Sequence, residues 1–203
     1  MNQLEKYNKK YDHYSRWVSY WHQIKNIFDL ESKSIIEIGV GSGVFSEYLK
    51  KRGFNILTLD IDDSLEPDMV CDISSQHINS IYSDVVCAFQ VLEHIDLKNI
   101  EVAFDNICKM SKRNIIISLP QNVFSFKFYF KIPLFKPLKL LLTIPKFKEN
   151  TFFQKNGHYW EIGNKKTSKK WLINNFKKRG FELIKDYTIF ENPYHVFFIF
   201  KKI

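Results

Sequence analysis

The sequence predicts an α/β protein whose strands form a doubly wound, mostly parallel sheet with helices on both faces. Three observations support this fold class. Short runs rich in β-branched residues alternate with stretches of helical spacing. A glycine-rich turn follows the first of these runs. Acidic residues stand at the ends of three successive runs, at the edge where open parallel sheets bind ligands.

The predicted elements follow one another in the order that such a sheet requires. Apolar residues at helical spacing predict one or two amphipathic helices over residues 4–29. A helix that begins at Thr167 or Ser168 is expected to end at Gly180. Two closing strands joined by the turn sequence ENPY predict an antiparallel hairpin, and with it one antiparallel edge strand. The expected strands are 34–38, 55–60, 68–72, 83–90, 114–120, 181–190 and 195–202, with helices over 44–52 and 97–111.

Length and composition bound the class of protein. At 203 residues the chain suits one domain, and it contains no linker, so we expect a single domain over residues 1–203. Its first fourteen residues lack the apolar core of a signal peptide, and prolines and lysines interrupt the most apolar stretch, KIPLFKPLKLLLTIP. Cys71, Cys87 and Cys108 are scattered in apolar contexts, as reduced core cysteines are. These features predict a cytoplasmic protein.

The sequence EIGVGSG joins the first strand to the first helix of the predicted sheet. Gly39, Gly41 and Gly43 let the backbone turn sharply and let a ligand lie against main-chain atoms. A phosphate-binding P-loop is excluded, because no lysine follows the glycines. A dinucleotide-binding G-x-G-x-x-G loop fits imperfectly, because Val44 or Ser46 stands where the third glycine would be.

This loop resembles the E/D-x-G-x-G-x-G motif of the class I S-adenosylmethionine-dependent methyltransferases, whose fold is Rossmann-like. Further signals follow in the family's order. Asp60 ends the second strand, and Asp72 lies in VCDI after the third. The stretch SDVVCAFQVLEHI is similar to the family's fourth strand and its V-L-E-H continuation. The resemblance covers residues 34–120 densely and extends through GHYWEIG nearly to the end of the chain.

The resemblance implies methyltransferase activity with S-adenosyl-L-methionine as the cofactor. The glycines would admit its methionine and ribose part, and Glu37 would orient the loop and the amino group. Asp60 would bind the ribose hydroxyls, and Asp72 would accept from the adenine amino group. The remaining implied cofactor contacts are Ile61, which would flank the adenine, Ile73, and Gln90, which would face the methionine end.

Histidines near the expected methyl site are the candidate bases. Methyl transfer from a sulfonium is an in-line displacement, but an alcohol or phenol acceptor must also lose a proton. We expect His94, after the fourth strand, and His158, in NGHYWEIG, to act there. Glu93 would form an acid–base pair with His94 or orient it. The alternative is a structural role, at a helix start for His94 and in loop packing for His158.

A divalent metal site is the more specific alternative to an acid–base role for these residues. Ubiquinone-pathway O-methyltransferases and small-RNA 2′-O-methyltransferases bind a divalent metal with E-x-x-E-H, joined in the RNA enzymes by a later histidine. Here Gln90 replaces the first carboxylate of that motif, which removes a charged oxygen ligand. We therefore expect no metal, although His158 stands as a possible later ligand.

Two segments are expected to cover the site. Residues 1–30 would form a helical lid. Residues 121–166 are a long excursion rich in Phe and Lys, which predicts an ordered cap over the acceptor pocket. Its aromatic residues would form a small satellite core, or its apolar face would rest on a membrane. Its lysines could hold a phosphate, a nucleotide or a lipid headgroup.

The expected acceptor is a small molecule, because no appended module is present to grip a polymer. We expect O-methylation of a polar metabolite, phosphorylated or sugar-linked, such as a surface-glycan precursor, and no nucleic-acid partner. The net charge of +8 is also compatible with anionic lipid, with RNA, or with a lysine-rich surface in water. Alternatives are a lipid or prenylated acceptor reached in peripheral contact with a membrane, RNA ribose 2′-O-methylation, and a catalytically silent cofactor-binding subunit. The sequence leaves the oligomeric state open.

Overall fold

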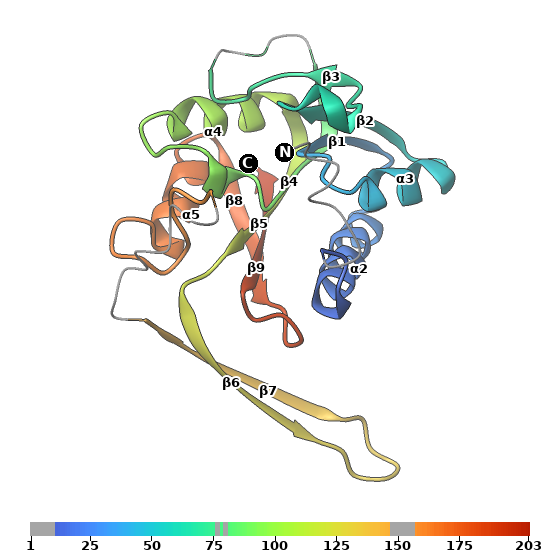
Figure 1. Ribbon diagram of the computed structural model, residues 1–203, viewed down its shortest axis with the longest axis vertical. Coiled ribbons are helices and arrows are strands. Elements are labelled where there is room, and N and C mark those ends of the chain that lie inside the picture. The colour runs from blue at the N-terminus through green and yellow to red at the C-terminus, as the bar shows by residue number, and fades with distance from the viewer. Residues whose placement is uncertain (1–10, 76–77, 79–80, 147–156) are drawn as a thin grey trace.

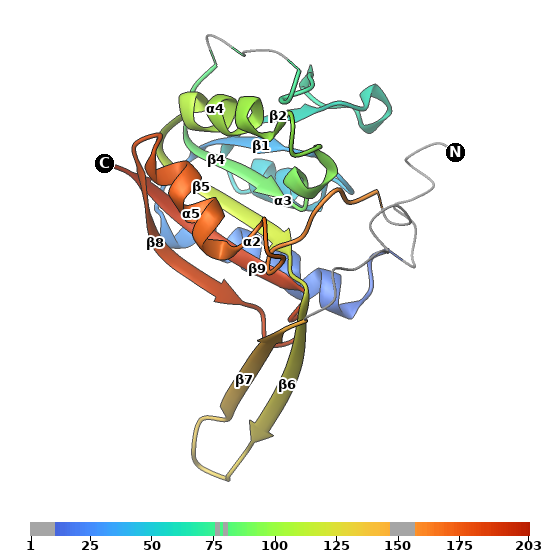
Figure 2. The same cartoon turned by 90° about the vertical axis from the view of Figure 1, so that its left-hand side faces the viewer.

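The computed structural model describes residues 11–75, 78, 81–146 and 157–203. Its centre is a seven-stranded sheet in the order β3-β2-β1-β4-β5-β9-β8, with helices on both faces (Figures 1 and 2). The helices are α2 (Tyr14–Asp29), α3 (Val44–Lys51), α4 (Ile100–Met110) and α5 (Lys169–Lys177). The strands of this sheet are β1 (Ser34–Ile38), β2 (Asn55–Asp60), β3 (Met69–Val70), β4 (Ser83–Phe89), β5 (Ser111–Pro120), β8 (Phe181–Thr188) and β9 (His195–Lys202).

The predicted doubly wound, mostly parallel sheet is confirmed. Strands β3, β2, β1, β4 and β5 pair in parallel, and β9 pairs antiparallel with both β5 and β8. The predicted hairpin therefore lies at the edge, and its antiparallel member β9 is the inner of its two strands. Burial explains this order: β9 is buried over its first six residues, whereas β8 is largely exposed or half-buried and takes the edge.

The sheet separates two layers of core that fix the position of its carboxyl edge. Ile35 of β1 packs in the layer that includes α2 and α3, and its neighbour Ile36 packs in the layer that includes α4 and α5. Phe45 and Phe104 are large buried side chains of these two layers. Because both faces are covered, the loops that follow β1, β2 and β4 emerge from a rigid base at one edge.

The described part of the predicted lid belongs to the body of the protein. Ile27 of α2 is fully buried in the core, and the Tyr20 hydroxyl lies 2.7 Å from Ser42 Oγ in the glycine loop. Residues 1–10, which the lid prediction includes, lie outside the described residues. No described helix is both long and apolar enough to cross a membrane. The three cysteines are buried and form no disulfide, as predicted.

The prediction of a cap is wrong for the part of 121–166 that runs from Val123 to Pro145. Strands β6 (Val123–Phe130) and β7 (Leu138–Pro145) form a separate antiparallel hairpin that projects from the body (Figures 1 and 2). Its aromatic side chains are exposed, so they form no satellite core. The alternation of Phe with other residues in β6 has the period of a strand, and this pattern directs the segment into a hairpin. Residues 147–156 of the predicted cap lie outside the described residues.

Candidate active site

The glycine loop lies at the carboxyl end of β1. Gly39, Gly41 and Gly43 have φ angles of 84°, 58° and 75°, in the left-handed region that favours glycine. The N–H of Gly39 donates to the carbonyl oxygen of Leu59 at 2.7 Å, which ties the loop to β2. A Cβ on Gly39 would lie 2.3 Å from Val91 Cγ2. Both backbone conformation and space therefore require glycine at position 39.

Asp60 ends β2 and faces this loop. Its Oδ2 accepts from the N–H of Val40 at 2.8 Å, and its Oδ1 accepts from the N–H of Asp62 at 3.0 Å. Each carboxylate oxygen has two acceptor positions, so Asp60 can hold both loops and still accept from ligand hydroxyls. Sequence analysis expected the ligand contact but missed this second role as a tie between two loops.

A cavity of about 310 Å³ opens at this edge of the sheet. Ile61 is 66% exposed and forms part of its wall. Asp72 is held in place, because its Oδ1 accepts from the N–H and the hydroxyl of Ser74 at 2.8 and 2.7 Å. The predicted site residues that line the cavity are Gly39, Asp60, Ile61, Asp72, Ile73 and His94, and sequence analysis missed Val91, Ile95, Asn99 and Tyr159. Apolar walls with a few placed polar groups are typical of small-molecule sites.

Glu37 lies buried in β1, close to the glycine loop. Burial raises the pKa of Glu37 to about 8; a hydrogen bond with Ser46 opposes this shift and the charge of Asp60 adds to it. Its Oε2 has no hydrogen-bond partner among the residues that the structure describes. A buried carboxyl oxygen without a partner is costly, so a ligand amino group or a water would stabilise it.

Gln90 differs from the other predicted cofactor contacts. Its φ angle of 58° is unusual for a residue other than glycine. Its N–H donates to the carbonyl of Ser118 at 3.0 Å, and its Nε2 donates to Ser118 Oγ at 3.3 Å. The side chain therefore bonds to β5, and its contact with the methionine end stays a prediction.

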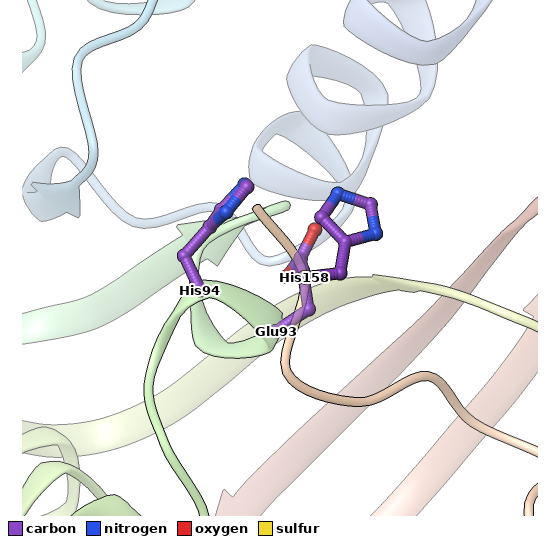
Figure 3. A group of neighbouring side chains, drawn as sticks. All are labelled: Glu93, His94 and His158. Carbon is purple, nitrogen blue, oxygen red and sulfur yellow. The ribbon is translucent and has the colours of Figure 1, made fainter. Parts of the chain in front are cut away.

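The three residues predicted to be catalytic form one cluster. Glu93 and His94 lie on the short helix η2 (Leu92–His94) directly after β4, and His158 comes from the segment that follows the hairpin (Figure 3). One ligand-type atom of each residue lies within 4.8 Å of the others. The rings of His94 and His158 meet edge to face, with centroids 4.8 Å apart.

A hydrogen bond defines the tautomer of His94. Its Nδ1 lies 2.8 Å from the carbonyl oxygen of Gly157. Because a carbonyl can only accept, Nδ1 carries the proton, and Nε2 is the basic nitrogen of the neutral ring. The N–H of Tyr159 also donates to the carbonyl of Glu93 at 2.7 Å. These two bonds fasten the segment around His158 against η2.

Glu161 and Tyr194 orient His158, and sequence analysis missed both. The Nδ1 of His158 lies 3.5 Å from Glu161 Oε1, and the hydroxyl of Tyr194 donates to the same oxygen at 2.6 Å. Burial opposes ionisation of Glu161, but hydrogen bonds from His158 and Tyr194 outweigh it and lower the pKa of Glu161. Burial and the bond to Glu161 raise the pKa of Tyr194. The signal for Glu161 was its i+3 spacing from His158 in GHYWEIG.

Glu93 does not form the predicted hydrogen-bonded pair with His94. It is fully buried, and neither of its carboxylate oxygens has a hydrogen-bond partner among the described residues. The reason is local: Nδ1 of His94 bonds to the carbonyl of Gly157. Burial raises the pKa of Glu93 to about 8, Glu161 raises it further, and its own backbone N–H and Arg16 oppose this shift. In the absence of a bound metal ion, this raised pKa favours the protonated form of Glu93 at neutral pH.

The donor atoms of the cluster suit a divalent metal. One carboxylate oxygen and two imidazole nitrogens are common ligands of zinc and of other transition metals. The unsatisfied oxygens of Glu93 fit this use, whereas the amide of Gln90 bonds to Ser118. The expectation that no metal binds therefore stays a prediction, and a thermal experiment tests it directly.

We expect Glu93→Gln to stabilise the metal-free protein at pH 8.5 and to change it little at pH 5. Burial raises the pKa of Glu93 in the folded state from 4.5 to about 8. The contribution of Glu93 to the free energy of unfolding is therefore fully present below pH 4.5 and is lost as the pH rises through 8. Glutamine cannot ionise, so the gain at pH 8.5 should be about 1–3 kcal/mol. Thermal unfolding in the presence of a chelator measures it.

The control for this substitution is Glu182→Gln, at an exposed position of β8. Its melting temperature should follow that of the unmodified protein at both pH values. If Glu93→Gln raises the melting temperature equally at pH 5 and pH 8.5, the result contradicts a raised pKa for Glu93. If Mn²⁺ or Zn²⁺ raises the melting temperature of the unmodified protein but not of Glu93→Gln, the cluster binds a metal and the expectation of none is wrong.

Comparison with known proteins identifies the family of the chain. A family model of the methyltransferase domain matches residues 11–186. No curated protein sequence matches the chain. The fold is similar to that of the N-methyltransferase NodS from Bradyrhizobium japonicum WM9, solved with S-adenosyl-L-homocysteine, at 11% identity, a TM-score of 0.65 and coverage of 100% of this chain and 99% of that one.

Two further solved structures share the fold. Magnesium protoporphyrin IX methyltransferase (ChlM) from Synechocystis PCC 6803 has 14% identity and a TM-score of 0.60, with coverage of 91% of this chain and 82% of that one. The methyltransferase domain of bacterial CtHen1-C has 12% identity and a TM-score of 0.61, with coverage of 91% and 96%. At such identities these likenesses show the fold, and the family match carries the assignment. The chain belongs to the methyltransferase-domain family, which confirms the class I S-adenosylmethionine-dependent methyltransferase predicted from its motifs.

Proposed function

We propose that this methyltransferase transfers the methyl group to a hydroxyl oxygen of a small polar acceptor, phosphorylated or sugar-linked. The observation that carries the proposal is the contact between two imidazoles, His94, which lines the cavity after β4, and His158. A hydroxyl must lose its proton as it attacks, whereas a neutral amine attacks through a lone pair that it already has. Two oriented histidines suit the first kind of acceptor.

In the proposed complex the cofactor lies across the carboxyl edge of the sheet. Asp60 binds the ribose hydroxyls, and Ile61, Asp72 and Ile73 surround the adenine, because all four line the same cavity. The glycine loop, with Gly39, Gly41 and Gly43, would accommodate the methionine part. Glu37 would meet the amino group, since its buried Oε2 has no partner among the described residues.

The proposed reaction needs one proton acceptor. The acceptor oxygen forms a bond to the methyl carbon, the carbon–sulfur bond breaks, and sulfur keeps the electron pair, which leaves S-adenosylhomocysteine. Nε2 of His94 takes the proton in its neutral tautomer. Glu161 Oε1 lies 3.5 Å from Nδ1 of His158, and its carboxylate would hold the proton on that nitrogen and leave Nε2 of the ring basic as well. Glu161 is a positioning residue in this scheme.

A panel of acceptors tests the proposal. The purified protein is incubated with S-adenosylmethionine and with sugar phosphates, nucleotide sugars, phenols or primary amines, and S-adenosylhomocysteine is measured. We expect product with one hydroxyl class and none with primary amines. Product with amines alone overturns the oxygen assignment. Calorimetric binding of S-adenosylhomocysteine without turnover on any acceptor favours a catalytically silent subunit.

A lipid-linked acceptor is the second candidate. It is favoured by the β6–β7 hairpin, which follows β5 directly at the carboxyl edge of the sheet and exposes an apolar surface. Adding lipid-linked sugars and prenylated phenols to the panel separates the two candidates. The buried free cysteines suit a reducing compartment, so we place the reaction in the cytoplasm.

A further inference from the structure

The β6–β7 hairpin has two chemically different faces. Residues that pair across an antiparallel ladder lie on the same face. The first face, which we call the apolar face, consists of the pairs Phe124–Ile144, Phe126–Leu142, Phe128–Leu140 and Phe130–Leu138. The second, the polar face, consists of Val123–Pro145, Ser125–Thr143, Lys127–Leu141 and Tyr129–Lys139. All hydroxyl and ammonium groups of the two strands thus lie on one side.

The polar face is the one that contacts the body of the protein. The Nζ of Lys127 donates to the backbone oxygen of Glu191 at 3.1 Å, and the Nζ of Lys139 lies 2.5 Å from Glu191 Oε1. Glu191 belongs to the turn between β8 and β9. The apolar face therefore points away from the body, and each of its eight side chains is between 41% and 64% exposed.

The tip of the hairpin is still more exposed. Leu134 is 104% exposed and Phe135 is 72% exposed, and Lys131 and Lys136 lie on the two sides of this pair. The sequence from Val123 to Lys146 contains no Asp or Glu. Its basic residues are Lys127, Lys131, Lys136, Lys139 and Lys146. Apolar exposure and positive charge thus coincide in one projecting element (Figure 2).

We propose that the β6–β7 hairpin is a membrane-docking element that inserts its tip and apolar face into the surface of a bilayer containing anionic lipid. Large contiguous apolar surfaces are uncommon on proteins that meet only water. Lysines beside an inserted apolar tip can extend to the headgroups, where the negative surface potential of anionic lipid attracts them. A hairpin without acidic residues suits that potential.

Single-stranded nucleic acid fits this surface less well. Such partners stack bases on aromatic rings and need cations beside those rings to follow the phosphates. On the apolar face half of the side chains are aliphatic, and the lysines of the strands lie on the opposite face beside Glu191. One lysine beyond β7, Lys146, lies over a ring of the apolar face, that of Phe124. The apolar face therefore matches the hydrocarbon of a bilayer better than it matches stacked bases.

Vesicle sedimentation of the full chain tests the proposal. We expect binding to vesicles of 70% phosphatidylcholine and 30% phosphatidylglycerol, and weaker binding to pure phosphatidylcholine. The double variant Leu134→Ser/Phe135→Ser should lower the partition coefficient at least tenfold, because two inserted apolar side chains are lost. Lys131→Glu/Lys136→Glu should lower binding to the anionic vesicles and leave the binding to phosphatidylcholine unchanged.

Tyr129→Ser is the matched control, because Tyr129 is 54% exposed but lies on the polar face. It should keep the partition coefficient within twofold of the unmodified protein. Calorimetric affinity for S-adenosylhomocysteine, unchanged in every variant, verifies the fold. Absence of sedimentation with either vesicle overturns the proposal, as does an equal loss in Tyr129→Ser. A dimer in sedimentation velocity that Phe126→Asn dissociates, without vesicle binding, would assign the apolar face to pairing of two copies instead.

Discussion

Replacing Asp60 by alanine is expected to weaken S-adenosylmethionine binding between ten- and one-hundred-fold, or about 1.4 to 2.8 kcal/mol. The first reason is the loss of charge-assisted hydrogen bonds to the ribose hydroxyls. The second is internal to the protein. The N–H groups of Val40 and Asp62 lose their acceptor, so the loops on both sides of the ribose position are no longer tied together. Calorimetric titration with the demethylated cofactor measures the affinity.

Two further variants separate these contributions. Asp60→Asn keeps one acceptor oxygen and should give an intermediate loss, because one of the two backbone bonds survives. Asp63→Ala removes a neighbouring exposed acid and corrects for the change in local charge. If Asp60→Ala binds as tightly as the unmodified protein, the ribose assignment is wrong. If Asp60→Ala loses only as much cofactor affinity as Asp63→Ala, Asp60 acts through its charge alone and makes no specific hydrogen bond to the ribose.

The parts of the fold that local sequence determines were predicted well. Each strand of the parallel sheet is a short β-branched run followed by a turn residue, so β1, β2 and β4 lie within one or two residues of their expected bounds. The meeting of Gly39, Asp60 and Asp72 at one edge of the sheet was also predictable, because the carboxyl edge of a parallel sheet brings successive strand ends together. The cavity that they line follows from topology.

The contacts around His158 were not predictable in the same way. Glu161 is a near neighbour of His158 in sequence, but Tyr194 is 36 residues away and reaches Glu161 only because the turn before β9 lies beside the segment. That segment is held by the carbonyl of Glu93 and by the side chain of His94, both from η2, more than sixty residues earlier in the chain. No spacing pattern in the sequence predicts contacts between residues so far apart in the chain.

The hairpin was misassigned for a related reason. Alternation in β6 was visible, but β7 contains the run LKLLLTIP, whose consecutive leucines hide the period of a strand. Composition indicated an ordered segment and could not indicate its direction. In the structure the hairpin contacts Glu191, which bonds to Lys127 and Lys139 and lies more than fifty residues further along the chain.

Turnover should fall roughly 100-fold in His94→Ala at saturating acceptor, while the affinity for the cofactor changes less than threefold. Loss of a general base has about this effect on proton transfer, and the cofactor keeps its bonds to Asp60 and the glycine loop. His22→Ala, on α2 and away from the cluster of Glu93, His94 and His158, serves as the control. Turnover equal to that of the unmodified enzyme removes His94 from catalysis.

Glu161→Gln then identifies which histidine takes the proton. The carboxylate of Glu161 stabilises a positive charge on His158, from which it is 3.5 Å away, and the ring of His158 in turn contacts the ring of His94. If His158 is the base, loss of the carboxylate that orients it lowers turnover at saturating acceptor. If His94 is the base, turnover stays near that of the unmodified enzyme, because Nδ1 of His94 is bonded to the carbonyl of Gly157. A merely structural Glu161 would lower the melting temperature and leave the turnover of the folded enzyme unaltered.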